Sequence, residues 1–367
     1  MVRPTSRPVV ETLVWRGRSA GVYAPTRHRP AVAPLLPHPG ILVSTSNGGW
    51  VPMRRPWHAA TPQSGASPNY PSPAARRLAA AQQLAHERGW SAPEVLWETS
   101  GGSVLACGPV VIRIAAADRA PVAAPQQIQL ARLLLSYGVA VAEPMSYEVL
   151  HMGPDVATLW CRVHDAAGPV DTDQLLRQVH LVHTVPIEHV QRVLGYSPPA
   201  LTHAPRRFLE HLLPIQAADP DPRWVEVVDE VMDLHDWLTA RWDDLDLVLL
   251  HGDTNRRNVL VQADGTIVLC DLENVQVGPD AWDITSPTVD AALGRPWGRP
   301  LLPAGADPRL WMVLLRLRAL DQVVFRGYEH ALGAGDPAEV QQLLDWFDDG
   351  MPGLDRLSDV AGTDRGR

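Results

Sequence analysis

The chain has 367 residues, 46% of them hydrophobic, which is enough to bury a sizeable core in one large bilobal unit or in two domains. All 32 basic residues are arginine, which excludes chemistry that needs a lysine amine, such as a Schiff base or the lysine of a P-loop. A formal net charge of -9 argues against nucleic acid as a partner, and the acidic second half could attract a cationic substrate, although solvated helix faces give the same count.

A proline-rich extension and a helix open the chain. Residues 1–70 are dense in proline, serine, arginine and glycine and lack a sustained periodicity, which predicts a disordered extension. The spacing of residues 73–89 predicts a helix in which Ser72 is the N-cap, Pro73 takes the first helical position and Gly89 follows the last turn.

Two glycines interrupt the strand-like segment that follows. Residues 94–115 have strand composition and are broken at Gly101 and Gly102, directly before Ser103. Two glycines in a turn between strands let backbone N–H groups approach phosphate oxygens without obstruction by side chains, so these three residues are candidate nucleotide contacts. An ordinary turn between two strands is the competing interpretation.

Arg113 lies in the middle of the next apolar run. Its neighbours are Ile112 and Ile114, so its side chain points either toward solvent or into a cleft. In a cleft, a guanidinium can bind a phosphate through two parallel N–H bonds, which makes Arg113 a candidate nucleotide contact. A surface arginine on a half-exposed strand is the alternative.

The middle of the chain is predicted to be mainly helical. A helix over residues 125–137 and two strand-like runs precede residue 171, after which helical spacing dominates. The helix over residues 222–242 carries an apolar stripe and leads into the most informative segment of the chain. His180 and His183 could be metal ligands, but without a third ligand in view packing or capping is the favoured role.

The segment that follows predicts a β-hairpin with polar ends. An apolar run leads into the polar stretch HGDTNRRN and then into VLVQ and TIVLC, which are separated by Ala-Asp-Gly. If Asp264 and Gly265 are the two central residues of a type I′ turn, Asn258 and Asp271 face each other at the open end of the hairpin. Asp253, on the entering loop, adds a second carboxylate nearby.

These polar residues suit metal-assisted chemistry. Oxygens of Asn258 and Asp271 are suitable ligands for Mg²⁺, which proteins usually hold with one or two oxygens plus substrate phosphates. Asp253 is then left to orient and deprotonate an attacking hydroxyl. A surface hairpin with solvated ends is the alternative, and the joint occurrence of the three residues favours the functional interpretation.

The segments HGDTNRRN and CDLEN resemble the catalytic core of the aminoglycoside phosphotransferase family, small-molecule kinases with a protein-kinase-like fold. By this resemblance, Asp253 matches the catalytic base, and Asn258 and Asp271 match the Mg²⁺ ligands. His251 matches a structural position of the loop, and Asp283 in GPDAWDI matches a buried carboxylate that anchors the loop.

The resemblance extends to the first half of the chain and covers residues 75–355 in all. It places residues 101–103 in the loop that covers the nucleotide, and Arg113 where a cation contacts the α- and β-phosphates. Such folds usually carry a glutamate on the following helix, where this chain has Gln127, and a glutamine can still accept a hydrogen bond from an arginine. Backbone groups of residues 160–163 are expected to meet the adenine.

The expected fold is α+β, a protein-kinase-like bilobal fold with a small antiparallel-β N-lobe and a larger helical C-lobe. We expect an extension over residues 1–70, a nucleotide-binding N-lobe over residues 71–165, and a C-lobe over residues 166–360 that holds the catalytic loop and the acceptor site. The predicted function is transfer of the γ-phosphoryl group of ATP or GTP, with Mg²⁺, to a hydroxyl group of a small molecule.

Two other functions compete with this prediction. A catalytically silent nucleotide-binding sensor or scaffold is favoured by Arg113 and Gln127. A protein kinase is disfavoured, because Asp271 is followed by Leu272 and Glu273 rather than by Phe-Gly. Glu273 either assists the metal or the substrate or is a surface carboxylate. The acceptor stays open among aminoglycosides, other antibiotics, sugars and metabolites.

The expected partners are the nucleotide and the acceptor. We expect no binding to nucleic acid or to a membrane, and the protein is expected to be a monomer or a homodimer. Cys107, Cys161 and Cys270 lie far apart and form no CxxC pair, which fits a reducing cytoplasm. The sequence contains no run of about 18 apolar residues, so no membrane helix is predicted. The first 30 residues lack the apolar stretch of a signal peptide.

Overall fold

The computed structural model describes the chain over residues 42–44, 50–52, 72–98, 101–116, 123–166, 168–295, 301, 307–333 and 335–354. The chain divides into two compact units, residues 1–70 and residues 71–367. In the first unit, β1 (Leu42–Ser44) pairs with β2 (Trp50–Pro52) in an antiparallel ribbon. The rest of the extension predicted over residues 1–70 lies outside the described residues, so its predicted disorder stays a prediction.

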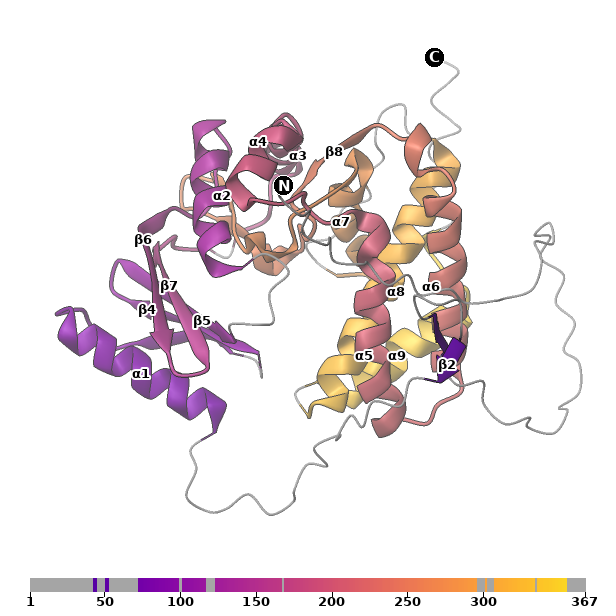
Figure 1. Ribbon diagram of the computed structural model, residues 1–367, viewed down its shortest axis with the longest axis horizontal. Helices are drawn as coiled ribbons and strands as arrows, with labels where there is room; N and C mark the ends of the chain where they lie inside the picture. The colour runs from indigo at the N-terminus through magenta and orange to yellow at the C-terminus, as the bar shows by residue number, and fades with distance from the viewer. Residues whose placement is uncertain are drawn as a thin grey trace, which may run out of the picture. The chain divides into compact units, whose positions relative to one another are not determined.

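The second unit begins with helix α1 and an antiparallel sheet of five strands in the order β3-β4-β5-β7-β6. The strands are β3 (Glu94–Glu98), β4 (Gly102–Cys107), β5 (Val110–Ala116), β6 (Pro144–Met152) and β7 (Asp155–Cys161). The buried residues of α1 (Pro73–Glu87) form a small core with β4, β5 and β7 (Figure 1). This core includes Leu84, Leu105 and Ile112 and is separate from the main core of the unit.

The start of α1 confirms the predicted capping. The Ser72 hydroxyl accepts a hydrogen bond from the backbone N–H of Ala75 at 3.1 Å, which satisfies one of the free donors of the first turn. Pro73 is the first helical residue, and Gly89 follows the helix with a φ of +68°, a backbone conformation that glycine adopts without strain.

Helix α2 (Ala124–Ser136) connects the sheet to the rest of the unit. It packs against β6, β7 and α4 (Ile187–Leu194), and its residues Ile128, Leu130 and Leu134 belong to the main core. The sheet therefore contacts the helical region through α2 as well as through the chain connection.

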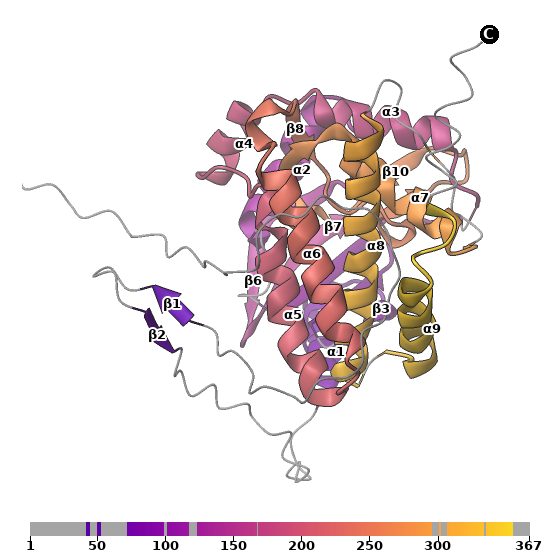
Figure 2. The ribbon, with the colours of Figure 1, turned by 90° about the vertical axis from the view of Figure 1, so that its right-hand side faces the viewer.

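The remainder of the unit is mostly helical. Besides α4, its helices are α3 (Thr172–His183), α5 (Ala204–Ala218), α6 (Arg223–Thr239), α7 (Thr285–Ala292), α8 (Pro308–Ala331) and α9 (Pro337–Asp348). Helices α5, α6 and α8 lie side by side, and α7 and α9 pack on α8 (Figures 1 and 2). A five-stranded antiparallel sheet followed by a mostly helical region is typical of the protein-kinase-like fold, so the expected α+β fold is confirmed.

Two short antiparallel strand pairs interrupt the helices and carry the polar motifs. Strand β8 (Leu247–Leu250) pairs with β11 (Gln276–Pro279), and between them β9 (Val259–Val261) pairs with β10 (Ile267–Leu269). The outer pair brings the start and the end of the motif segment together. The inner pair is the predicted hairpin.

The predicted register of this hairpin is wrong by one residue. Val259 faces Leu269, so the position opposite Asn258 is Cys270, whose backbone N–H donates to the Asn258 carbonyl at 3.0 Å. The loop that connects the two strands has three residues instead of the predicted two. Within it, the Gly265 N–H donates to the Gln262 carbonyl, and Gly265 adopts a φ of +85°. Asp271, which was predicted to face Asn258, therefore lies one residue beyond the position that does face it.

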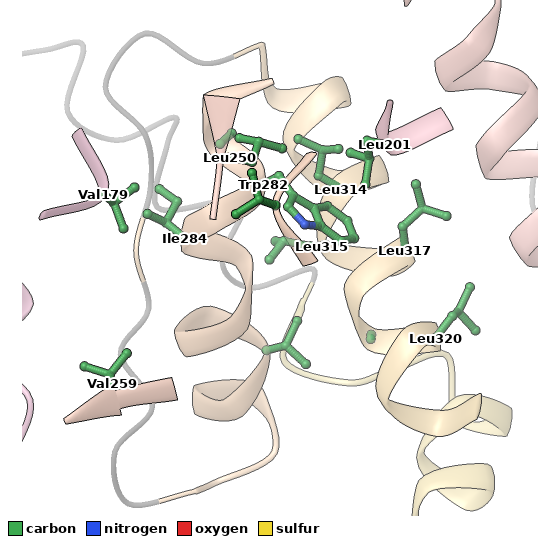
Figure 3. Packing of buried hydrophobic residues seen from close by; sticks show 14 of the residues in the cluster. Val179, Leu201, Leu250, Val259, Trp282, Ile284, Leu314, Leu315, Leu317 and Leu320 are labelled. Atoms are coloured by element: carbon green, nitrogen blue, oxygen red, sulfur yellow. The ribbon is translucent and has the colours of Figure 1, made fainter. Parts of the chain in front are cut away.

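The main core holds the motif segment against the helices. Trp282, in the short helical turn Asp280–Ile284, lies among apolar residues that include Leu250 of β8 and Leu314 and Leu315 of α8 (Figure 3). Burying an aromatic ring of this size fixes the turn relative to both elements. In the part of the chain that is described, no helix has the length and apolar character needed to cross a membrane.

Candidate active site

A cavity of about 1040 Å³ lies between the sheet and the helical region. Its lining includes the residues that the sequence singled out for chemistry: Gly101, Gly102, Ser103, Arg113, Asp253, Asn258 and Asp271. Residues from α7, α8 and α9 complete the wall on the helical side. The structure thus brings all of the predicted site residues to one cavity.

Arg113 is held by two hydrogen-bond acceptors, Gln127 and Glu273, and by an ion pair with Asp271. One guanidinium nitrogen donates to the Gln127 side-chain oxygen at 2.6 Å, and the other lies 2.6 Å from Glu273 and 2.7 Å from Asp271. The predicted hydrogen bond between Arg113 and Gln127 is therefore present. Glu273, whose role the sequence left open, supplies the carboxylate that Gln127 lacks.

The surroundings of Arg113 keep its guanidinium charged. Burial lowers the pKa of Arg113, but the charges of Asp271 and Glu273 and the hydrogen bond to Glu273 outweigh burial, so the pKa is raised overall. The guanidinium thus stays charged in the cavity, where Asp271 and Glu273 balance its charge.

Asp271 has an unusual backbone conformation. Its φ of 65° is in the left-handed region, which residues with a Cβ adopt at a cost of about 1–2 kcal/mol. Asp271 lies two residues after the end of β10 and directly before the short helical turn Leu272–Asn274, so its left-handed conformation joins the strand to the turn. This conformation helps to place the carboxylate within the cavity, although the register puts Asp271 beyond the end of the hairpin pairing.

Asp253 and Asn258 are linked directly. The Asn258 amide nitrogen donates to the backbone carbonyl of Asp253 at 2.9 Å and to its carboxylate at 3.0 Å. These bonds close the loop that contains the turn Arg256–Asn258 and fix the orientation of the Asp253 side chain. The carbonyl oxygen of the Asn258 amide is left for another partner.

Arg318 of α8 supports the Asp253 loop from the helical side. It is only 3% exposed, its guanidinium donates to the Gly252 carbonyl at 2.8 Å, and it lies 3.5 Å from the Asp253 carboxylate. The guanidinium also lies over the Trp282 ring at 4.2 Å, and the indole N–H donates to the same Gly252 carbonyl at 3.1 Å. The backbone before Asp253 is thereby held by two donors.

Asp283 anchors the start of the same loop, as predicted. Its fully buried carboxylate accepts hydrogen bonds from the backbone N–H groups of His251 and Gly252, both at 2.8 Å, and lies 3.1 Å from the His183 ring. The Thr254 hydroxyl donates to the Asp283 backbone carbonyl. Burial raises the pKa of Asp283, but the hydrogen bond and charge of His183, the charge of His251 and the Gly252 N–H together hold the pKa below its ordinary value.

The loop also needs glycine at position 252. Gly252 has a φ of +86°, and a Cβ added to it would lie 2.0 Å from the backbone oxygen of Asn274. No side chain fits this contact, so the close approach of the Asp253 loop to the segment after Asp271 depends on the absence of one.

The glycine turn of the sheet lies on the opposite side of the cavity. A Cβ added to Gly102 would lie 2.9 Å from the Ile114 carbonyl, so glycine allows β4 and β5 to approach closely. The Ser103 hydroxyl is buried and has no hydrogen-bond partner in the described part of the chain. Ser103 is part of the cavity lining, so a buried hydroxyl without a partner lies beside the space that a ligand would occupy.

The donors around Asp271 fit a cation that is held partly by a substrate. One carboxylate oxygen of Asp271 is buried and accepts no hydrogen bond, although Arg113 lies nearby as an ion-pair partner. Within the described ranges, no three histidine, cysteine, aspartate or glutamate side chains converge as a complete metal cage. Mg²⁺ is usually bound by one or two protein oxygens together with phosphate oxygens, and Asp271 and Asn258 could supply these.

The segment that was expected to meet the adenine also lines the cavity. Trp160, Cys161, Arg162 and Val163 are all part of the wall. The backbone N–H groups of Cys161 and Arg162 already donate to other carbonyls within the fold. A base bound here would therefore rely on other backbone groups of this segment.

Sequence reasoning missed Arg318. The residue belongs to α8, in the part of the chain for which the sequence indicated only that helical spacing dominates. A usable signal was its position: Arg318 follows Leu314 and Leu315 at helical spacing, so it falls on the apolar face where a charge needs a specific partner.

Comparison with known proteins places this arrangement in context. A family model described as "Phosphotransferase enzyme family" matches residues 66–320. Comparison with curated protein sequences gives no match.

Several solved structures share the fold. A spectinomycin phosphotransferase in complex with ADP and spectinomycin aligns with a TM-score of 0.52 at 13% identity, covering 76% of this chain and 97% of that one. A choline/ethanolamine kinase family protein from Mesorhizobium loti aligns with a TM-score of 0.53 at 16% identity, covering 77% and 98%. A thermostable mutant of an aminoglycoside phosphotransferase, in its apo form, gives 0.53 at 13%, covering 76% and 98%. At these identities the likeness shows the fold alone.

Proposed function

Because the chain belongs to the phosphotransferase enzyme family, we propose that it transfers the γ-phosphoryl group of ATP or GTP to a hydroxyl group of a small molecule. The observation that carries this proposal is the sharing of one cavity by Asp253 and the Arg113–Asp271 ion pair. A base and a phosphate-binding cluster facing the same space can bring a hydroxyl and a nucleotide into contact. The similar fold of a phosphotransferase solved with ADP supports a nucleotide in this cavity.

In the proposed reaction, Asp253 orients the acceptor hydroxyl and accepts its proton. The hydroxyl oxygen forms a bond to the γ-phosphorus as the bond from that phosphorus to the β-phosphate oxygen breaks, which releases ADP or GDP. Asn258 and Arg318 hold the Asp253 carboxylate and its backbone in place for this step. Fixed positioning of this kind supplies much of the rate enhancement in phosphoryl transfer.

The nucleotide phosphates would contact the sheet side of the cavity. The Arg113 guanidinium supplies a fixed positive charge, and Gly101, Gly102 and Ser103, which line the cavity at the start of β4, let the phosphates approach the backbone without obstruction by large side chains. Asn258 and Asp271 would hold Mg²⁺, which neutralises the negative charge of the phosphates when it is bound. The same proposal places the protein in the cytoplasm.

A silent nucleotide-binding sensor was the competing function, and it rested on Gln127. The ion pair between Arg113 and Glu273 weakens that argument, because the cation still has a carboxylate partner. Asp253, Asn258 and Asp271 also line the cavity together. A protein that only bound nucleotide would have no physical need for a positioned base.

The test is phosphoryl transfer from labelled ATP and GTP to a broad library of hydroxyl compounds. Wild-type protein is compared with Asp253→Ala and with Asp243→Ala, a matched control in which an exposed aspartate is removed. We expect transfer by wild type and by Asp243→Ala, and a loss of at least about a hundredfold in Asp253→Ala. Nucleotide binding without transfer to any compound, and no difference between wild type and Asp253→Ala, would support the sensor instead.

A further inference from the structure

One wall of the cavity has a charge arrangement that constrains the acceptor. This wall, called the acceptor wall below, is formed by the end of α7, by Arg295 and by residues of α8 and α9. Arg318 joins it to Asp253, because its guanidinium lies 3.5 Å from Asp253 and 3.2 Å from Asp321. If Asp253 deprotonates the hydroxyl, as in the proposed function on which this inference rests, the acceptor contacts this wall.

A continuous chain of ion pairs runs along the acceptor wall. Glu329 lies 2.6 Å from Arg326, and Arg326 lies 3.3 Å from Glu339. Glu339 is also 3.3 Å from Arg295, which lies 2.5 Å from Asp290. The chain crosses from α8 to α9 and then to α7, so it links three helices through side chains that line the cavity.

Most of the charges on the described part of the acceptor wall are paired. Glu329, Glu339 and Asp290 face Arg326 and Arg295 in the chain of ion pairs, which leaves one negative charge, and Asp321 and Asp253 share Arg318, which leaves a second. The sequence between Arg295 and Asp307 contains no acidic residue, so that segment cannot add a carboxylate. The acidic excess of the second half of the chain is therefore not concentrated on this wall.

This pairing disfavours an acceptor with several ammonium groups. Such a molecule could reach a carboxylate only by displacing an arginine, which exchanges one ion pair for another and leaves a guanidinium without its partner. Arg326 and Arg295 are 20% and 29% exposed, so their unpaired charges would be only partly solvated. The remaining ammonium groups would then face arginines, and like charges placed together at an interface are costly.

An uncharged molecule rich in hydroxyl groups meets no such conflict. Each guanidinium has five N–H donors and each carboxylate has several acceptor positions, so hydroxyls can bond to them without breaking the ion pairs. Phe325 and Leu332, which are 36% and 43% exposed, line the same cavity and offer apolar contact. A wall of this composition suits a ring that carries hydroxyls at its edge and an apolar face.

We propose that the acceptor is an uncharged, hydroxyl-rich molecule of the sugar or glycoside class and that the ion-pair chain from Glu329 to Asp290 excludes polycationic acceptors. The specificity comes from the arginines as much as from the carboxylates, because the arginines occupy the positions that ammonium groups would need. This makes Arg326 and Arg295 specificity-determining residues of the proposed reaction.

The test compares acceptors that differ in charge but share a scaffold. Free-amine aminoglycosides are paired with their fully N-acetylated forms, and amino sugars with the parent sugars, and neutral glycosides that carry an apolar group are added. Transfer from labelled nucleotide gives kcat/KM for each member. Binding is measured separately by calorimetry with MgADP present. We expect the uncharged member of a pair to be favoured by at least about tenfold in both measurements.

Variants of the acceptor wall test the cause of the preference. Arg326→Gln removes one arginine of the chain and releases Glu329 and Glu339, so we expect its preference to shift toward the amine member by about tenfold. Arg309→Gln, which removes an exposed arginine from the same helix, is the matched control and should keep the wild-type preference. If Arg326→Gln does not fold, Arg295→Gln tests the same effect. The comparison of charged and uncharged acceptors with wild-type protein depends on neither variant.

The possible outcomes separate this inference from the proposed function. Transfer that depends on Asp253 but favours the free amines would overturn the inference and leave the proposed function intact. An unchanged preference in both arginine variants would also overturn it. Failure of transfer to every acceptor, together with no difference between wild type and Asp253→Ala, would overturn the proposed function and the inference together.

Discussion

The guanidinium of Arg113 and the carboxylate of Glu273, 160 positions apart in the chain, lie 2.6 Å apart in the cavity. Arg113 comes from the middle of β5, and Glu273 from the turn directly after Asp271. The contact joins the sheet to the segment that carries the polar motifs. It also gives Arg113 a carboxylate partner although the helix that follows β5 carries Gln127 at the aligned position.

The pairing of Arg113 can be tested by placing a lysine at position 113 and a glutamate at position 127. An ammonium group cannot reproduce the planar fork that reaches Gln127, Asp271 and Glu273, so we expect Arg113→Lys to raise the KM for nucleotide about tenfold. Adding Gln127→Glu to Arg113→Lys should recover most of this loss, because the lysine regains a carboxylate partner. Initial rates at varied ATP measure both effects. Equal KM values for the single and the double variant would contradict this account.

Arg318 is expected to act on turnover more than on nucleotide binding. Its contacts are with the Gly252 carbonyl and the Asp253 carboxylate, away from the sheet side of the cavity. Arg318→Gln should therefore lower kcat by about ten- to a hundredfold while the KM for nucleotide changes little. Arg318→Lys keeps the charge and should recover part of kcat, and Arg309→Gln on the same helix is the control. A fall in thermal stability with kcat unchanged would show that Arg318 is only structural.

The left-handed conformation of Asp271 makes asparagine the informative replacement. Asparagine tolerates a positive φ better than alanine does, so Asp271→Asn should fold like wild type while losing the charge that would hold Mg²⁺. We expect a higher Mg²⁺ concentration for half-maximal activity and a lower kcat, measured by titrating Mg²⁺ at saturating nucleotide. Asp271→Ala should in addition unfold at a lower temperature. An unchanged Mg²⁺ requirement in Asp271→Asn would argue against this residue as a metal ligand.

Asp283 is expected to contribute stability that depends on pH. Because its folded pKa is lowered, its stabilising contribution is complete above about pH 5 and is lost as the pH falls through the folded pKa. Asp283→Asn should reduce the free energy of unfolding at pH 7 by about 2–4 kcal/mol, since it removes a fully buried, hydrogen-bonded charge. Urea unfolding at several pH values should show this difference shrinking in acid. The control, Asp243→Asn, replaces an exposed residue and should show no such trend.

The sequence predicted the presence of the hairpin but not its register. Alternating apolar runs around Asp264 and Gly265 correctly predicted a hairpin at this place. The same dipeptide fits a two-residue loop and the end of a three-residue loop, because Gly265 supplies a positive φ in either one. The choice between the loops shifts the register by one residue, and local sequence does not decide it.

Contacts between distant segments were the other limit. The sequence indicated that Arg113 faces a cleft and that Gln127 could bond to it, and both features are present. It left Glu273 undecided and did not single out Arg318, because their partners lie far away in the chain and become visible only when the lobes are assembled. Local patterns therefore identified most of the polar residues that share the cavity but not the side chains that support them.

The guanidinium of Arg113 has a practical consequence for chemical labelling. A nucleotide derivative that labels its site by acylating an ε-amino group needs a lysine beside the phosphates. This chain has no lysine, and the basic side chains that line its cavity are arginines, whose guanidinium groups stay protonated and are poor nucleophiles. Such a reagent is therefore expected to leave the protein unlabelled whether or not a nucleotide is bound.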